Sequence, residues 1–317
     1  MFSVVVPLYN KGQSIRQALE SILGQTFKPS EIIVVDDGST DNGPDVVREF
    51  TEQGVCLIGQ PNQGVSAARN FGISSSKCEY IAFLDADDFW LPGHLEAVRS
   101  LILSHPQAAL FSTAHVIRRQ GRYQRPYSVF PNEWQGLVPD FFQAYSKGLG
   151  LVNSSTAVVR RAALMQVGGF PVGIRRGEDI IVWSKLALLH PIAHVEAVTA
   201  IYDQQAENRT DRLRMTEPPG SLSFLADLLN KEELAAAQRV GVVRLFDRIA
   251  FFTASGLVLN ADRLGALSIR DLALACGRNR TAAAISFISF VPAWLLQLAR
   301  NLRHRKINKN MLDDFHG

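Results

Sequence analysis

The most restrictive feature of this sequence is a regular alternation of two patterns over its first 120 residues. Short runs rich in β-branched residues, such as Glu31–Asp36, are each followed by a longer segment with helical spacing. In Ser14–Gly24, for example, the apolar residues at 15, 18, 19 and 22 would share one helix face. This alternation predicts βαβ units, and therefore a mainly parallel sheet with helices on both faces.

The predicted elements can be placed from these patterns. Strands are expected at Ser3–Pro7, Glu31–Asp36, Val55–Gly59, Tyr80–Asp85 and Ala108–Ile117. Helices are expected between them at Ser14–Gly24, Asp45–Gln53, Val65–Ser74 and Pro92–Ser104. The expected fold class is α/β with a Rossmann-like central sheet.

The middle of the chain is less regular, and strand patterns stop near residue 206. A strand running into a helix is expected over 153–167, a helix over 179–190 and an extended segment over 192–202. Later helices are expected at 221–229, 231–254 and 269–275. We therefore expect one α/β unit over residues 1–205 and an α-helical C-terminal region over residues 206–317.

Carboxylates follow the fourth predicted strand directly, in the sequence Asp85-Ala86-Asp87-Asp88. The carboxyl ends of strands in an open α/β sheet are where such folds bind ligands. Because Asp85 and Asp87 are two residues apart, an extended chain points both side chains the same way. Hard oxygen ligands suit Mg²⁺ or Mn²⁺. The pattern therefore indicates a metal site, with a solvated turn as the alternative.

Polar residues also follow the other predicted strands, at the segments 7–12, 36–40 and 60–70. No Gly-x-Gly-x-x-Gly follows the first strand, which disfavours a dinucleotide site of the Rossmann type, and no Gly-Lys-Ser/Thr phosphate loop is present. A bound metal would then have to neutralise any phosphate.

The cysteines and the N-terminal residues indicate the cellular compartment in which we expect the protein. The chain has three cysteines, Cys56, Cys78 and Cys276, without metal or disulfide spacing, which indicates reduced, buried thiols in a cytosolic protein. The apolar N-terminus has no basic region and no cleavage site, so we expect it to be a first strand and not a signal peptide.

Five of these segments, in this order, resemble the motifs of the family 2 glycosyltransferases, which use nucleotide-sugars and have the GT-A fold. The resemblance covers residues 1 to about 205, and its motifs are Val5–Asn10, Val34–Asp41, Asn62–Gly64 with Ala67–Asn70, Leu84–Asp88, and Gly177–Asp179 with Trp183.

The resemblance implies a nucleotide-sugar site. Asp36 would accept from the imide N–H of a uracil, because a carboxylate is a strong acceptor for that group. The residues implied in donor binding are Pro7, Tyr9, Asn10, Asp36, Asp37, Gly64, Arg69, Asp85 and Ala86. The alternative for Asp36 and Asp37 is a turn with a helix cap. Arg69 would either neutralise phosphate or hold its loop by an ion pair.

The resemblance also divides the carboxylates by role. Asp87 would be the direct ligand of Mn²⁺ or Mg²⁺, bridging to the diphosphate, and Asp85 would lie near the ribose or a metal-bound water. Asp88 would be structural. The metal would stabilise the leaving nucleoside diphosphate.

Asp179 is the implied general base, with Glu178 in support. An inverting transfer needs a carboxylate opposite the leaving group to take the proton of the acceptor hydroxyl. The alternative is that both are acids placed favourably at a helix N-terminus.

The sequence departs from many members of the family just after Tyr202, where those proteins carry a basic residue or a histidine. The resemblance therefore does not supply a third protein ligand for the metal. Arg209 could instead supply positive charge to the diphosphate.

The C-terminal region carries an uncharged run, residues 281–299, within a basic segment. Seven basic residues and no acid lie between 278 and 309, although the net charge of the whole chain is only +3. An interfacial helix with a basic flank is expected, making peripheral membrane contact through 281–309. A buried helix and a full membrane span are the alternatives.

These features together predict an inverting, metal-dependent glycosyltransferase. It would move a sugar from a UDP-sugar to a glycan acceptor at the cytoplasmic face of the inner membrane. A lipid-linked glycan, as in surface-polysaccharide synthesis, is one candidate for that acceptor. Alternatives are a GDP- or dTDP-sugar donor, and a non-catalytic sugar-nucleotide sensor or membrane scaffold. No nucleic-acid partner is expected, because no recognition motif accompanies the basic segment.

Overall fold

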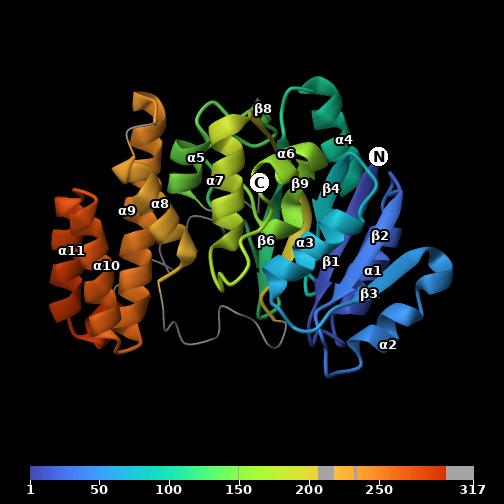
Figure 1. Cartoon of the computed structure of the whole chain (residues 1–317), viewed down its shortest axis with the longest axis horizontal. Helices are drawn as coiled ribbons and strands as arrows, with labels where there is room; N and C mark the ends of the chain where they lie inside the picture. Colours follow the sequence, from blue (N-terminus) through green and yellow to red (C-terminus); the bar gives the residue numbers. More distant parts are fainter. Residues whose placement is uncertain (149, 206–217, 232–233, 298–317) are drawn as a thin grey trace.

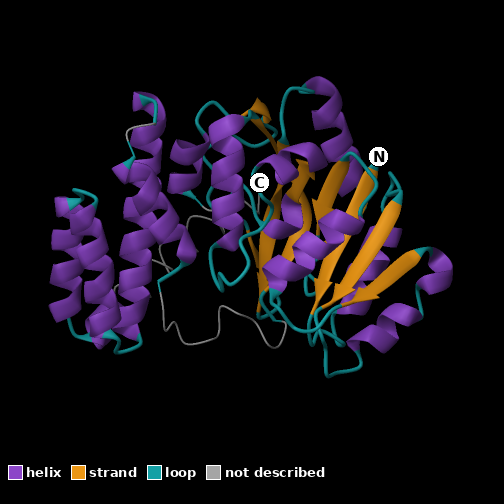
Figure 2. Cartoon of the chain, viewed as in Figure 1, coloured by secondary structure: helices purple, strands orange, loops and turns teal. Residues whose placement is uncertain are grey.

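The computed structural model describes residues 1–148, 150–205, 218–231 and 234–297. Figure 1 shows a sheet with helices on both faces and a group of helices at one side, and Figure 2 separates the two kinds of element. The strands are β1 (Phe2–Leu8), β2 (Glu31–Asp36), β3 (Val55–Gly59), β4 (Tyr80–Phe83), β5 (Phe89–Trp90), β6 (Leu110–Arg119), β7 (Arg122–Gln124), β8 (Gln135–Leu137), β9 (Ala157–Arg160) and β10 (Ile192–Asp203).

Most of the helices that the sequence predicted lie close to their expected positions. The helices are α1 (Ile15–Leu23), α2 (Gly43–Arg48), α3 (Val65–Ser75), α4 (His94–Ser104), α5 (Phe141–Lys147), α6 (Arg161–Gln166), α7 (Glu178–Leu189), α8 (Gly220–Asn230), α9 (Ala236–Leu259), α10 (Arg263–Ala275) and α11 (Asn279–Phe290). Three predicted helices differ. The one expected over 45–53 is α2 followed by a separate 3₁₀ turn, Thr51–Gln53. The one expected over 231–254 is α9, which begins at 236 and ends at 259, and the one expected over 269–275 is α10, which already begins at 263.

The sheet has the strand order β3-β2-β1-β4-β9-β6-β10-β5, with β7 on β6 and β8 on β10. The pairs β3-β2, β2-β1 and β1-β4 are parallel, as the βαβ alternation predicted. β9 runs antiparallel between β4 and β6, and β6 and β10 are again parallel. The α/β class is therefore confirmed, with a parallel first half and a mixed second half.

Helix α3 packs closely on the parallel half of the sheet. A side chain at Gly72 would place its Cβ only 2.3 Å from Cγ1 of Val5 in β1, so the approach of helix to strand needs a glycine. This contact matters because α3 carries Arg69 near its middle, so the position of the helix on the sheet determines where that guanidinium lies.

One hydrophobic core continues from the sheet into the C-terminal helices. It includes Phe83 of β4, Trp183 of α7 and Phe246 of α9, each buried completely. Helix α9 packs against α5, α8, α10 and α11, and α7 lies between the sheet and α8. The expected boundary at residue 206 falls at the start of residues 206–217, which are outside the described part of the chain.

The prediction that the three cysteines are buried is wrong. Cys56 is exposed, because it lies on β3 at the edge of the sheet, and Cys78 and Cys276 are partly exposed.

The uncharged run at 281–299 is broken at Val291 and Pro292, after α11 ends at Phe290. One side of α11 is buried through Ala282, Ile285 and Ile288, whereas Phe287 and Phe290 are 72% and 80% exposed. Among the described helices, none is long and apolar enough to cross a membrane. Residues 298–309 of the basic segment lie outside the described residues.

Candidate functional site

The loops after β1, β2, β3 and β4 meet at one edge of the sheet, because these four strands are parallel neighbours. Asn10, in the loop after β1, has a left-handed backbone (φ 51°). Its N–H donates to Ser39 Oγ at 3.1 Å, and its side-chain oxygen accepts from the N–H of Thr40 at 2.8 Å. The first two loops are thereby joined. Tyr9 is 46% exposed beside them.

The two acids after β2 have different surroundings. Asp36 is partly exposed and accepts one hydrogen bond from the N–H of Ser39 at 2.9 Å. Asp37 is buried, and its oxygens accept from Gln60 Nε2, the N–H of Gln63 and the N–H of Gly64. Asp37 therefore shapes the loop that leads to α3, and a contact from Asp37 to a nucleoside stays a prediction. Asp36 keeps a carboxylate surface open to a ligand.

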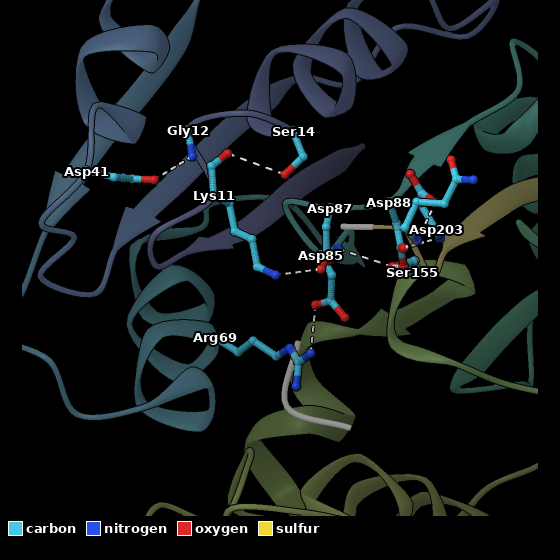
Figure 3. Close-up of polar contacts among 11 residues, drawn as sticks. Lys11, Gly12, Ser14, Asp41, Arg69, Asp85, Asp87, Asp88, Ser155 and Asp203 are labelled. Carbon is cyan, nitrogen blue, oxygen red and sulfur yellow. Dashed lines mark hydrogen bonds and ion pairs between the residues drawn. The ribbon is translucent and has the colours of Figure 1, made fainter. Parts of the chain in front are cut away.

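Each of the three acids after β4 has different partners (Figure 3). Asp85 contacts the guanidinium of Arg69 at 2.7 Å, and Asp87 contacts the ammonium of Lys11 at 2.7 Å. Asp88 is buried, and its carboxylate accepts hydrogen bonds from the hydroxyl of Ser155 and from the N–H of Asp203, the latter at 2.9 Å. Burial and the neighbouring acids raise the pKa of Asp88 well above its usual value. Asp88 thus anchors the turn, while Asp85 and Asp87 stay partly exposed.

Ser155 joins this turn to the rest of the sheet. Its hydroxyl accepts from the N–H of Asp85 at 3.2 Å, and its carbonyl accepts from the indole N–H of Trp90 at 2.6 Å. The sequence did not predict a structural contact of this kind. No local pattern in the sequence could indicate it, because the partners are about 70 residues apart.

Arg69 connects the two acidic segments of the site. It is buried, and besides Asp85 it contacts Glu178 at 3.1 Å, with its guanidinium carbon 5.1 Å from the centre of the Phe170 ring. A buried arginine is stable when carboxylates pair with it. The acids hold the pKa of Arg69 above its ordinary value, despite its burial. The end of β4 and the start of α7 are therefore held together by one side chain.

Glu178 and Asp179 lie at the N-terminus of α7, after Gly177 in a left-handed conformation (φ 78°). Burial raises the pKa of Glu178 to about 7, with the charge of Asp179 adding to the effect. Burial also raises the pKa of Asp179, against the opposing effect of Arg69. A carboxylate whose pKa is raised binds a proton more readily, as a general base must.

The remaining predicted donor-binding residues lie at the same edge. Pro7 is partly exposed near the end of β1, and Ala86 is buried between the two partly exposed acids. Gly64 is the N-cap residue of α3, with φ 89°. Sequence reasoning did not single out Lys11, although its position after Asn10 placed it in the correct loop. Arg209, considered as a phosphate contact, lies outside the described residues.

The chemistry of Asp85 and Asp87 fits a divalent ion that a diphosphate completes. Mg²⁺ is commonly held by one or two carboxylates together with substrate phosphates and water. Within the described ranges, no group of three or more His, Cys, Asp or Glu side chains could hold a metal ion. The pair therefore suits a metal that arrives with its phosphate ligand, and not a cage made by the protein alone.

The sequence of the chain is similar to those of known proteins. Residues 3–168 match the family model described as "Glycosyl transferase family 2". The uncharacterized glycosyltransferase RC0461 of Rickettsia conorii is 30% identical over 200 residues, which are 61% of this chain and 31% of that protein. YibD of Escherichia coli is 42% identical over 103 residues, which are 32% and 30%. The chain thus spans about a third of these curated relatives.

Solved structures share the fold, and two of them illustrate it. The structure of S. aureus TarS 1–349 in complex with UDP-GlcNAc has a TM-score of 0.75 and 20% identity, covering 89% of this chain and 83% of that one. The mannosyltransferase PcManGT from Pyrobaculum calidifontis, in complex with GDP-Man and Mn²⁺, has a TM-score of 0.58 and 18% identity, covering 90% and 78%.

Proposed function

The chain belongs to the family 2 glycosyltransferases and has their GT-A fold, and on that premise we propose that it transfers a sugar from a UDP-sugar to a glycan with inversion at the anomeric carbon. One observation carries the proposal. Arg69 contacts both Asp85 and Glu178, so the acids at the end of β4 and the base candidate Asp179 stand at one site.

Each residue of the site has a chemical task in this proposal. Asp36 accepts from the uracil imide, and the loop from Pro7 to Asn10 holds the nucleoside. Asp179 takes the proton of the attacking acceptor hydroxyl. Arg69 keeps Asp85 and Glu178 in place, and its positive charge limits the cost of gathering several acids in one place.

A divalent ion, Mn²⁺ or Mg²⁺, would be held by Asp87 and Asp85, and when bound it would stabilise the charge that develops on the nucleoside diphosphate. Lys11 contacts Asp87, and its ammonium would share in balancing that charge. Manganese is preferred in the proposal because the solved mannosyltransferase neighbour is described with Mn²⁺.

The choice of UDP is supported by a neighbour described with UDP-GlcNAc and by another structure of the same protein described with UDP. A screen of UDP-, GDP- and dTDP-sugars, with and without Mn²⁺, tests it through donor hydrolysis and calorimetric binding. We expect UDP-sugars to bind, and Asp36→Asn to weaken that binding whereas Asp45→Asn, at an exposed position, leaves it unchanged. If only GDP- or dTDP-sugars were turned over, the donor would belong to one of those classes and not to the UDP-sugars. If a nucleotide-sugar bound without being turned over, the result would favour a non-catalytic sensor.

Peripheral contact with a membrane remains part of the proposal, with a lipid-linked glycan as acceptor at the cytoplasmic face. It is supported by the exposed aromatic side chains of Phe287, Phe290 and Trp294, which is 66% exposed. Co-sedimentation with vesicles of phosphatidylglycerol and phosphatidylcholine tests it. Replacing the three aromatic residues by serine should reduce binding several-fold, and unchanged sedimentation would contradict the proposal.

A further inference from the structure

A pocket of about 390 Å³ lies between the start of α7, the start of α8 and the middle of α9. Asp179 and Ile180 form the α7 side, Ser221 the α8 side, and Ile249 and Phe252 the α9 side. The candidate base therefore lies between two regions. Its neighbour Glu178 contacts Arg69, which pairs with Asp85 at the edge of the sheet, and Asp179 itself lines this pocket.

The pocket holds a polar group whose hydrogen bonding is incomplete. The hydroxyl of Ser221 is fully buried and has no hydrogen-bond partner among the described residues. A buried hydroxyl without a partner costs free energy, so a ligand that supplied one would bind more tightly for it. A side chain at Gly177 would put its Cβ 2.5 Å from that hydroxyl oxygen, so a glycine is needed to leave room beside it.

The rest of the lining is mainly apolar, and one aromatic ring in it is held in position. Phe252 is 48% exposed, and the guanidinium carbon of Arg248 lies 5.1 Å from the centre of its ring. Arg248 is itself fixed by hydrogen bonds from Nη1 to the carbonyls of Ser146 and Lys147, at 3.1 and 2.8 Å. The ring thus offers a rigid apolar surface, which costs little entropy when a ligand packs on it.

An apolar wall with a few fixed polar groups is the usual form of a small-ligand site. A sugar ring has a matching pair of surfaces, since its C–H groups form an apolar face and its hydroxyls project from the rim. A sugar lying on Phe252 would have hydroxyls within the part of the pocket that Ser221 and Asp179 line.

We propose that this pocket binds the acceptor as a sugar ring, with its C–H face on Phe252, one hydroxyl toward Asp179 and another toward Ser221. The inference rests on the proposed function. The acceptor oxygen forms a bond to the anomeric carbon of the donor as the bond from that carbon to the phosphate oxygen breaks. The nucleoside diphosphate leaves with the electron pair, and the proton of the acceptor hydroxyl passes to Asp179.

Two adjacent residues provide a matched test. Phe251 is 37% exposed on the same helix but does not line the pocket. With methyl glycosides of glucose, galactose, mannose and N-acetylglucosamine as probes, transfer would be measured with the donor that the wild type turns over. We expect Phe252→Ala to raise the acceptor KM about tenfold or more without changing donor affinity, and Phe251→Ala to change it less than twofold.

Ser221→Ala gives a second test that does not depend on losing a large side chain. We expect it to fold at least as stably as the wild type, because it removes an unpartnered buried hydroxyl, and to raise the acceptor KM a few-fold. Equal KM values for both phenylalanine variants, or transfer only to polyol or polyprenyl phosphates in place of sugars, would overturn the acceptor pocket. Failure of the wild type to bind or hydrolyse any nucleotide-sugar would instead overturn the proposed function.

Discussion

The ammonium group of Lys11 lies 2.7 Å from a carboxylate oxygen of Asp87, so the loop after β1 supplies a cation to the acid proposed as the metal ligand after β4. Both side chains are only 15% exposed. The pair is therefore balanced without a metal ion, and an ion that binds Asp87 must share this carboxylate with Lys11 or displace it.

Replacing Lys11 should change metal affinity in a direction opposite to that expected for a ligand. We predict that Lys11→Met binds Mn²⁺ more tightly in the absence of nucleotide, on the order of three- to tenfold, because about 1 kcal/mol of competing attraction is removed. Titration followed by electron paramagnetic resonance measures it. Lys28→Met, at an exposed position, is the control. Weaker Mn²⁺ binding by Lys11→Met would contradict the prediction.

Asp179→Asn should separate binding from chemistry. The amide keeps the size of the side chain but cannot take a proton, so we predict a loss of transfer of roughly 10²- to 10⁴-fold. Affinity for the nucleoside diphosphate, measured by calorimetry, should stay near that of the wild type. Transfer at nearly the wild-type rate would show that Asp179 is only a favourable acid at the start of α7.

Arg69→Gln should destabilise the fold strongly, because Glu178 and Asp85 would lose their buried partner. We predict a loss of about 3 kcal/mol or more in the free energy of unfolding, measured by urea denaturation. In a cycle with Glu178→Gln the two effects should be less than additive. Arg48→Gln is the control, since the side chain of Arg48 is 62% exposed and should contribute little. Additive effects would mean that Arg69 and Glu178 are not coupled.

A buried histidine should make stability depend on pH in the acid range. His94 is fully buried and stacks on Trp90, and burial lowers its pKa to about 3. The unfolded chain binds this proton below its ordinary pKa near 6.5, whereas the folded chain does not. The stabilisation is therefore complete above pH 6.5 and is lost as the pH falls toward 3, by about 1.4 kcal/mol per pH unit.

The difference between wild type and His94→Gln isolates this effect from that of Glu178, whose raised pKa acts in the opposite sense as the pH falls below 7. Between pH 6.5 and 5, the wild type should lose stability more steeply than His94→Gln in urea denaturation. His105→Gln, at a partly exposed position, should keep the wild-type slope. Parallel curves for all three proteins would contradict the burial effect.

The parallel half of the sheet could be predicted from the sequence because its signals are local. The β-branched run of β2 and the apolar spacing of α1 depend only on near neighbours, and both elements lie close to the predicted bounds. The antiparallel insertion of β9 between β4 and β6 could not be predicted in the same way. Strand direction there depends on pairing between segments that are about 50 to 80 residues apart in sequence.

The same limit applies to the site. Asp85, Asp87 and Asp179 belong to sequence motifs that could be recognised, so we could expect them near one edge of the sheet. The side chains that pair with each acid could not be predicted. Asp37 turns inward to a loop about 25 residues away, and Lys11 reaches an acid 76 residues away, because distant loops meet only after the sheet has formed.

The continuous core across β4, α7 and α9 has a consequence for engineering this protein. Phe83, Trp183 and Phe246 belong to one packed cluster. The C-terminal helices therefore cannot be exchanged for other helices without disturbing the core of the α/β unit. A chimaera that joined residues 1–205 to foreign helices would uncover the outer surface of α7, the element that carries Asp179. Altered acceptor preference is therefore better sought by point substitutions along the exposed face of α9, which leave the cluster intact.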